Sequence, residues 1–104
     1  MAHKASEIFT VKEISDLLTP VFTNYGIRRA VLFGSYSKNS ATPKSDIDLC
    51  VDSGLRGLKF VGFMESVKNA VGGKDVDIFD VSHIEKNSMV EEEIGRTGVE
   101  IYAK

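Results

Sequence analysis

The chain alternates between segments whose apolar residues recur with helical spacing and short runs with the spacing of strands. From Thr10 onwards, apolar positions repeat about every 3.6 residues as far as Tyr25. Thr10 and Glu13 are spaced as in a capping box, the arrangement that opens many helices. The pattern predicts a helix over 10–25, which Gly26 ends and which Pro20 kinks or divides.

Four later segments carry the signature of short strands, because β-branched and aromatic residues gather between turn-forming residues. The predicted strands cover 29–33, 47–51, 75–79 and 99–102. Between them, the spacing predicts a short helix over 35–38, a long helix over 58–71 that Gly72 and Gly73 end, and a last helix that begins at Ser82 or Ser88 and ends within 95–98.

This order of elements predicts an α/β (α+β) fold: a small mixed β-sheet of about four strands with helices packed on one face. The sheet should be mixed rather than purely parallel, since the connections between strands differ in length. A chain of 104 residues is expected to form a single domain over 1–104, with 1–9 as a flexible N-terminal tail.

Composition narrows the classes of function. The formal net charge is −2, so the basic surface of a nucleic-acid-binding protein is missing and no direct binding to nucleic acid is expected. A single cysteine excludes an internal disulfide and favours a reducing compartment. The N-terminus lacks the apolar core of a signal peptide, and no apolar run approaches the length of a membrane span. A cytoplasmic location without membrane contact is therefore expected.

Two aspartates mark the head of the second predicted strand. Asp46 and Asp48 are two residues apart, so in a strand both would point to the same face. Carboxylates that close repel each other unless a proton or a cation lies between them, and Mg²⁺ prefers oxygen ligands. Asp75 and Asp77 repeat the spacing on the third strand. If these strands are neighbours, four carboxylates gather on one uncovered side of the sheet.

Gly34-Ser35 follows the first strand where the chain is expected to turn into a helix, and backbone N–H groups at such turns bind phosphate. Metal-binding carboxylates beside a phosphate-binding turn together indicate phosphoryl or nucleotidyl transfer. Among the remaining residues, Tyr36 is expected either to stack on a base or to pack beneath the short helix. Cys50 is expected to be a small buried hydrophobe, and the run 91–93 of three glutamates a solvated helix face.

The segment Leu32-Phe33-Gly34-Ser35-Tyr36, followed by Ser45-Asp46-Ile47-Asp48-Leu49, resembles the nucleotidyltransferase superfamily that includes DNA polymerase β. Within it, the short length is similar to the minimal nucleotidyltransferases, or MNT proteins. The resemblance runs from about Ile14 to Tyr102 and implies the nucleotidyltransferase fold. Where the family commonly has Ala, Arg or Lys, and Gly, this chain has Ser37, Lys38 and Asn39.

The resemblance implies roles for individual residues. Gly34 and Ser35 would hold the outer phosphates of a nucleoside triphosphate, and Lys38 keeps a positive charge that can reach them. Asp46 and Asp48 would bind Mg²⁺. Asp77 would be the third carboxylate, completing a second metal site or taking the proton from the attacking hydroxyl; Asp75 on the same face is the alternative. The implied cofactor is Mg²⁺, as two ions, with ATP as substrate.

The implied function is Mg²⁺-dependent transfer of NMP, with AMP from ATP as the leading choice, to a hydroxyl on a partner protein. MNT proteins pair with small helical HEPN proteins, RNase toxins that the transferase neutralises as an antitoxin by AMPylating a tyrosine. The alternative is a non-catalytic nucleotide-binding antitoxin that sequesters its partner by contact. The exposed helical surface is expected to serve either that partner or a homodimer.

Overall fold

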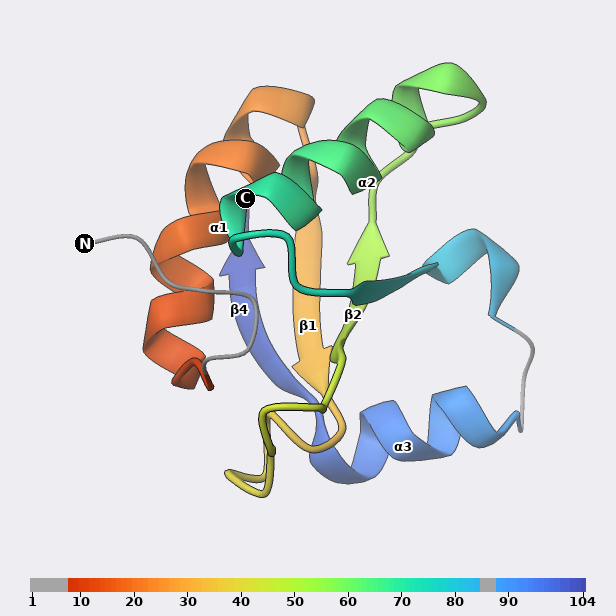
Figure 1. Ribbon diagram of the computed structural model, residues 1–104. Helices are drawn as coiled ribbons and strands as arrows, with labels where there is room; N and C mark the ends of the chain where they lie inside the picture. The colour runs from red at the N-terminus through yellow and green to blue at the C-terminus, as the bar shows by residue number, and fades with distance from the viewer. Residues whose placement is uncertain (1–7, 85–87) are drawn as a thin grey trace.

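The computed structural model describes residues 8–84 and 88–104. Its elements follow one another as α1 (Val11–Tyr25), β1 (Arg29–Phe33), β2 (Ile47–Asp52), α2 (Leu58–Ala70), β3 (Val76–Asp80), the 3₁₀ turn η1 (Val81–His83), α3 (Met89–Thr97) and β4 (Val99–Ala103) (Figure 1). The four strands form one sheet in the order β3-β2-β1-β4. The predicted mixed four-stranded α+β fold is confirmed, with strand boundaries within one residue of the expected ones.

The sheet brings the chain's two aspartate pairs to neighbouring strands. β1 runs antiparallel to both β2 and β4, whereas β2 and β3 are parallel and connected across α2. In the register of the parallel pair, Asp48 lies opposite Asp77. The expected gathering of carboxylates therefore has its basis in the pairing of β2 with β3.

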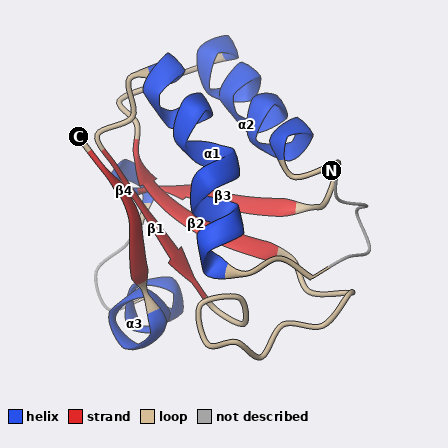
Figure 2. Cartoon of the chain, turned by 90° about the vertical axis from the view of Figure 1, so that its left-hand side faces the viewer, coloured by secondary structure: helices blue, strands red, loops and turns tan. Residues whose placement is uncertain are grey.

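The main core lies between the sheet and the two long helices, which pack side by side on one face (Figure 2). The period of two along β2 directs Ile47, Leu49 and Val51 into this core. From the helices, the period of 3.6 directs apolar side chains to the same layer, and the fully buried ones include Ile14, Leu18, Phe22, Phe63 and Val67.

α3 packs on the other face of the sheet. There Val31, Phe33 and Cys50 form a second, smaller cluster, against which Val90 and Ile94 of α3 pack. The expectation of helices on one face thus holds for α1 and α2, while α3 covers part of the opposite face. The physical reason is that β1, β2 and β3 carry apolar residues on both faces, so both need cover.

The start of α1 agrees closely with its sequence signals. Glu13 N donates to Thr10 Oγ1 at 3.0 Å and Thr10 N donates to Glu13 Oε1 at 2.8 Å, which completes the capping box. Gly26 ends the helix with a φ of 68°. Pro20 does not divide it, since Val11–Tyr25 is one continuous helix and Pro20 lies on its exposed side.

Two local expectations need correction. Phe9, the last residue of the predicted tail, is buried in the main core together with Ile14, as in a hydrophobic staple. Residues 1–7 of that tail lie outside the described residues. The short helix expected over 35–38 is a series of turns over 34–39, where Ser40 N bonds to Ser35 O five residues back and Asn39 has a φ of 57°. A residue in the left-handed region cannot continue a helix.

None of the helices in the described ranges has the length and apolar character needed to cross a membrane.

Candidate active site

Asp48 lies at the centre of the candidate site. It is half-buried on β2, on the sheet face that α3 partly covers. Burial raises the pKa of Asp48 from 3.8 to about 6, and the negative charges of Asp77, Asp46 and Glu93 add to the shift in that order. The site is therefore a cluster of acids in which one carboxyl group is costly to ionise without a nearby cation.

Gly34 is packed against this carboxyl group. Its φ of 76° favours glycine, and a Cβ at this position would lie 2.5 Å from Asp48 Oδ2. Gly34 N donates to Thr97 Oγ1 at 3.0 Å, and Thr97 Oγ1 donates in turn to Glu93 O at 2.8 Å. The backbone N–H of Gly34 is thus engaged by α3, and the glycine itself gives the Asp48 carboxylate its space.

Ser35 and Lys38 stand on the turn that follows. Ser35 is half-buried, and its carbonyl accepts hydrogen bonds from the backbone N–H and the hydroxyl of Ser40 at 3.0 and 3.3 Å. Lys38 Nζ lies 4.0 Å from Glu93 Oε1 and is half-exposed. The lysine side chain therefore lies close to Glu93 of α3, and about half of it is exposed to solvent.

Glu93 is a member of this site that the sequence interpretation missed. The run 91–93 was expected to be a solvated face, yet the Glu93 side chain is only 27% exposed and lies between Lys38 and Arg96. The helical spacing indicates this position, because Glu93 lies three residues after Val90 and four residues before Thr97. Val90 packs against the sheet, and Thr97 bonds to Gly34 at the end of β1.

Three further aspartates line a hollow of about 370 Å³ beside β3. Asp77 of β3 lines it together with Asp46 and Asp75, which directly precede β2 and β3, and α2 forms its other wall. Asp75 is 75% exposed and pairs with Lys68 at 3.4 Å. Asp77 lies opposite Asp48 in the register and contributes to its raised pKa, whereas Asp75 does not.

The donor chemistry of the cluster suits a hard divalent cation, because Asp46, Asp48 and Asp77 offer only carboxylate oxygens. A cation also relieves the repulsion that raises the pKa of Asp48. Within the described ranges, no three His, Cys, Asp or Glu side chains are already converged on one point as a metal site.

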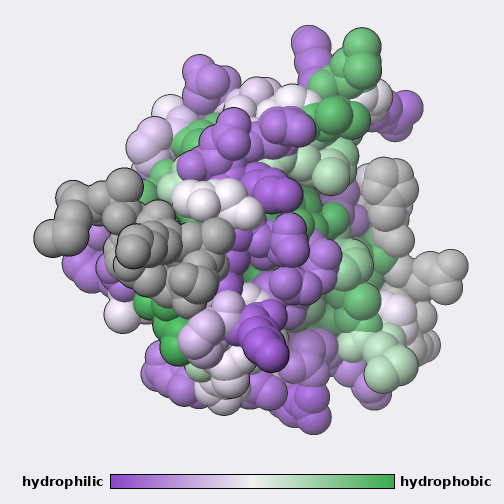
Figure 3. Space-filling model, viewed as in Figure 1, coloured by the Kyte–Doolittle hydropathy of each residue, from purple (hydrophilic) through white to green (hydrophobic). Residues whose placement is uncertain are grey.

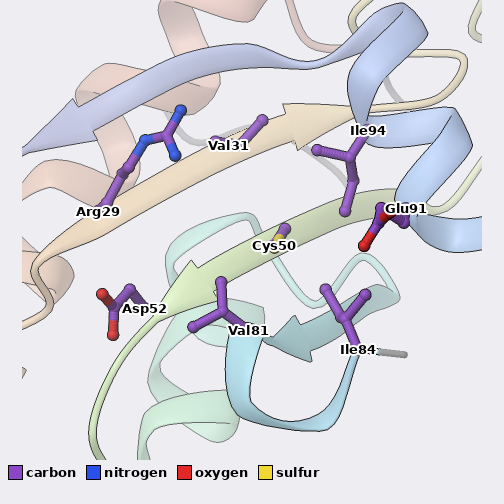
Figure 4. Close-up of a pocket in the computed structure, with 8 residues that line it drawn as sticks. All are labelled: Arg29, Val31, Cys50, Asp52, Val81, Ile84, Glu91 and Ile94. Carbon is purple, nitrogen blue, oxygen red and sulfur yellow. The ribbon is translucent and has the colours of Figure 1, made fainter. Parts of the chain in front are cut away.

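A second hollow, of about 280 Å³, lies further along the same sheet face, between α3 and η1 (Figure 4). Its lining is largely apolar, with Cys50 near the middle and Arg29, Asp52 and Glu91 around it. None of the three predicted catalytic aspartates lines it. Cys50 is buried, as expected.

Tyr36 packs rather than stacks on a ligand. Its side chain is 2% exposed and belongs to the main core. Lys74 Nζ lies 5.8 Å from the centre of the Tyr36 ring and donates to Pro43 O at 3.1 Å. One buried ammonium group therefore links the turn after β1 to the loop that leads to Asp46.

Comparison with known proteins agrees with the fold and the motif. Residues 16–104 match the family model described as "Polymerase beta, Nucleotidyltransferase". The chain is 32% identical over 75 residues to "Putative protein adenylyltransferase MJ0435" of Methanocaldococcus jannaschii, covering 71% of this chain and 81% of that protein. The chain belongs to the polymerase β-type nucleotidyltransferase family.

Solved structures of toxin–antitoxin complexes share the fold. One, described as a toxin–antitoxin with AMP-PNP, superposes with a TM-score of 0.72 at 19% identity over 86% of this chain and 73% of that chain. Another is described as a tri-AMPylated Shewanella oneidensis HEPN toxin in complex with MNT antitoxin. It gives a TM-score of 0.67 at 17% identity, over 91% of this chain and 74% of that chain.

Proposed function

We propose that this chain is a Mg²⁺-dependent nucleotidyltransferase that transfers AMP from ATP to a hydroxyl on a partner protein. The observation that carries the proposal is the pairing of β2 with β3, which sets Asp48 opposite Asp77 beside Gly34. The membership of the chain in a nucleotidyltransferase family supports the reaction. The 32%-identical relative, which bears the name of a protein adenylyltransferase, supports AMP and a protein acceptor.

In this proposal Asp46 and Asp48 hold a metal ion, and Asp77 is the third carboxylate. Asp77 is preferred to Asp75 because it faces Asp48, while Asp75 is engaged with Lys68. When bound, Mg²⁺, as one ion or two, would stabilise the charge on the attacking and leaving oxygens. Glu93, the further acid beside Asp48, is held by Lys38 and Arg96 and adds negative charge on the side of α3.

The chain's own groups then position the reactants. The turn that begins at Gly34 and Ser35, together with Lys38, binds the β- and γ-phosphates. Asp77 orients the acceptor hydroxyl and accepts its proton. The hydroxyl oxygen bonds to the α-phosphorus while the bond from this phosphorus to the β-phosphate oxygen breaks, and pyrophosphate leaves. Positioning and charge stabilisation are the main demands of such transfers.

We infer that the acceptor is a HEPN-type toxin and that the chain acts as its antitoxin. The fold is shared with an MNT antitoxin described in complex with a tri-AMPylated HEPN toxin, which supports this partner. The net charge of −2 disfavours a nucleic-acid acceptor.

The test uses ATP labelled at the α-phosphate, Mg²⁺ and a HEPN-type partner. Label should appear on the partner with the wild type, fall by at least about a hundredfold with Asp48→Asn, and remain within about threefold with Asp75→Asn. If the partner is bound and inhibited but carries no label, the chain acts by contact alone and the catalytic proposal is wrong.

A further inference from the structure

α2 exposes a row of large apolar side chains to solvent. Leu58, Val61 and Met64 recur every three residues and are 88%, 52% and 41% exposed. This spacing places them along one side of the helix. Single exposed apolar residues are ordinary, but a row along one helix marks a surface that a partner can cover.

Two members of this row, Val61 and Met64, line a hollow that also contains two of the candidate site aspartates, Asp46 and Asp77. Val61 and Met64, with Glu65 and Lys68, form the α2 wall of the hollow of about 370 Å³ whose opposite wall contains Asp46 and Asp77. The view toward this side of the molecule shows hydrophilic groups across its middle, with hydrophobic groups between them and at the start of α2 (Figure 3). We call the channel between α2 and β3 the α2–β3 groove; it is lined by Asp46, Val61, Met64, Glu65, Lys68, Asp75, Val76 and Asp77.

The other side of the groove is a strand edge. β3 is the terminal strand of the sheet, and in the described part of the chain it pairs only with β2. Such an edge presents backbone N–H and C=O groups to which an extended segment of another chain can bond. An apolar wall and a backbone edge together fit an extended polypeptide.

Charge favours a basic segment. The groove contains four carboxylates, those of Asp46, Glu65, Asp75 and Asp77, and a single ammonium group, that of Lys68. This lysine already pairs with Asp75 at 3.4 Å. The acidic lining repels nucleic acid and attracts lysine or arginine side chains.

We propose that the α2–β3 groove docks the acceptor: an extended segment of the partner protein that carries the reacting hydroxyl, basic residues and at least one apolar side chain that contacts Val61 and Met64. The proposal rests on the proposed function. In-line displacement requires the attacking oxygen to lie opposite the leaving pyrophosphate. The Gly34 turn lies on the β1 side of Asp48, and the groove lies at the sheet edge formed by β3, where Asp77 is one of its lining residues. An acceptor held in the groove therefore reaches the acid cluster around this edge, from the side away from the phosphate-binding turn.

The test compares Met64→Glu with Met89→Glu. Met89 is 85% exposed, lies on α3 and is absent from the groove, so it is a matched control. With a HEPN-type toxin as the acceptor, Met64→Glu should raise the KM for that protein about tenfold or more, with kcat and the affinity for Mg·ATP within about twofold. Met89→Glu should leave all three unchanged. The smaller change Val61→Ala should raise the same KM about threefold.

Equal KM values for the Met64 and Met89 variants would contradict docking of the acceptor in the groove but would leave the proposed function intact. If the wild type itself transfers no AMP, the proposed function fails. In that case the equilibrium affinities of the two variants for the toxin test, independently of catalysis, whether the toxin docks in the groove. A selective loss with Met64→Glu supports docking there, and equal affinities overturn it. A change in the oligomeric mass of the chain with Met64→Glu, at constant KM, would assign the groove to a second copy of the chain and contradict the proposal.

Discussion

Gly34 and the Asp48 carboxylate are in close contact at the centre of the site. The substitution Gly34→Ala therefore tests whether this contact is needed for metal and nucleotide binding. The added Cβ would lie 2.5 Å from Asp48 Oδ2, at a φ of 76° that an alanine adopts with strain. Gly26→Ala is the matched control, since Gly26 has a φ of 68° but no atom within 4 Å of the added Cβ. Both variants should lose about 1 kcal/mol in the free energy of unfolding.

Only Gly34→Ala should also impair metal and nucleotide binding, because it displaces the Asp48 carboxylate. Titration calorimetry with Mg²⁺ and a non-hydrolysable ATP analogue should show at least about tenfold weaker binding for Gly34→Ala and unchanged binding for Gly26→Ala. Equal affinities for the two variants would contradict the role assigned to the contact.

The raised pKa of Asp48 predicts a pH-dependent stability. Between 3.8 and about 6, the folded chain keeps the proton that the unfolded chain has lost. The free energy of unfolding therefore falls as pH rises through this window, and the loss is complete above about pH 6. Asp48→Asn removes this destabilisation. Without divalent cations it should gain about 1 kcal/mol at about pH 8, after allowance for solvent screening, and nothing at about pH 4.

Thermal unfolding at the two pH values measures this directly, since about 1 kcal/mol corresponds to a shift of roughly 4–8 °C in Tm for a domain of this size. A gain of the same size at both pH values would show that the substitution acts through something other than ionisation.

At the scale of elements, α3 is tied to the turn after β1 by one side chain. Thr97 Oγ1 accepts from Gly34 N and donates to Glu93 O. Thr97→Val removes both bonds and leaves the Gly34 N–H without its acceptor. Thr19→Val is the control, because Thr19 Oγ1 makes the same kind of bond, to Ser15 O at 2.7 Å, far from the site. We expect Thr97→Val to lower kcat for AMP transfer about tenfold or more and Thr19→Val to leave it unchanged.

Steady-state kinetics at saturating ATP and acceptor distinguish the two variants. If both variants lower kcat equally, the hydrogen bond between Gly34 N and Thr97 Oγ1 is not needed to position the catalytic groups.

Elements with a clear period could be predicted from sequence. The strands and the helices α1 and α2 have several turns or alternations each, and their boundaries coincide with glycines and caps. The turn at 34–39 could not, because six residues hold too little periodicity to distinguish a helix from successive turns. The sequence pattern also could not predict the sheet face on which α3 packs. That face is set by tertiary packing, because α3 covers the apolar face that α1 and α2 leave open.

In the site too, some features could be predicted from the period of the sequence and others depend on tertiary packing. The period of two predicted that Asp46 and Asp48 share a face and that Asp77 shares it if β3 adjoins β2. The contact of Gly34 with Asp48, the engagement of its N–H by Thr97 and the approach of Glu93 arise from packing between distant segments. The spacing of residues along the sequence does not predict such contacts. The one exception is Glu93, whose helical spacing from Thr97 places both residues on the same side of α3.

At the scale of the whole molecule, the acid cluster is open to solvent and bordered by the turn after β1, α3 and the α2–β3 groove. Binding of Mg·ATP should relieve the repulsion among Asp46, Asp48 and Asp77 and so stabilise the entire fold. At a ligand concentration about a hundredfold above Kd, the free energy of unfolding should rise by about 2.7 kcal/mol. Scanning calorimetry should show this rise for the wild type and none for Asp46→Asn; a rise in both would place the ligand elsewhere.

The central claim is that the chain breaks the bond between the α- and β-phosphates of ATP and keeps the α-phosphate on the acceptor. The most direct measurement compares two labels in parallel reactions with Mg²⁺ and a HEPN-type partner. Label at the α-phosphate should be found on the partner, and label at the γ-phosphate should be found only in released pyrophosphate, in equal molar amounts. Label from the γ-phosphate on the partner, or no α-label on it with the wild type, would contradict the account.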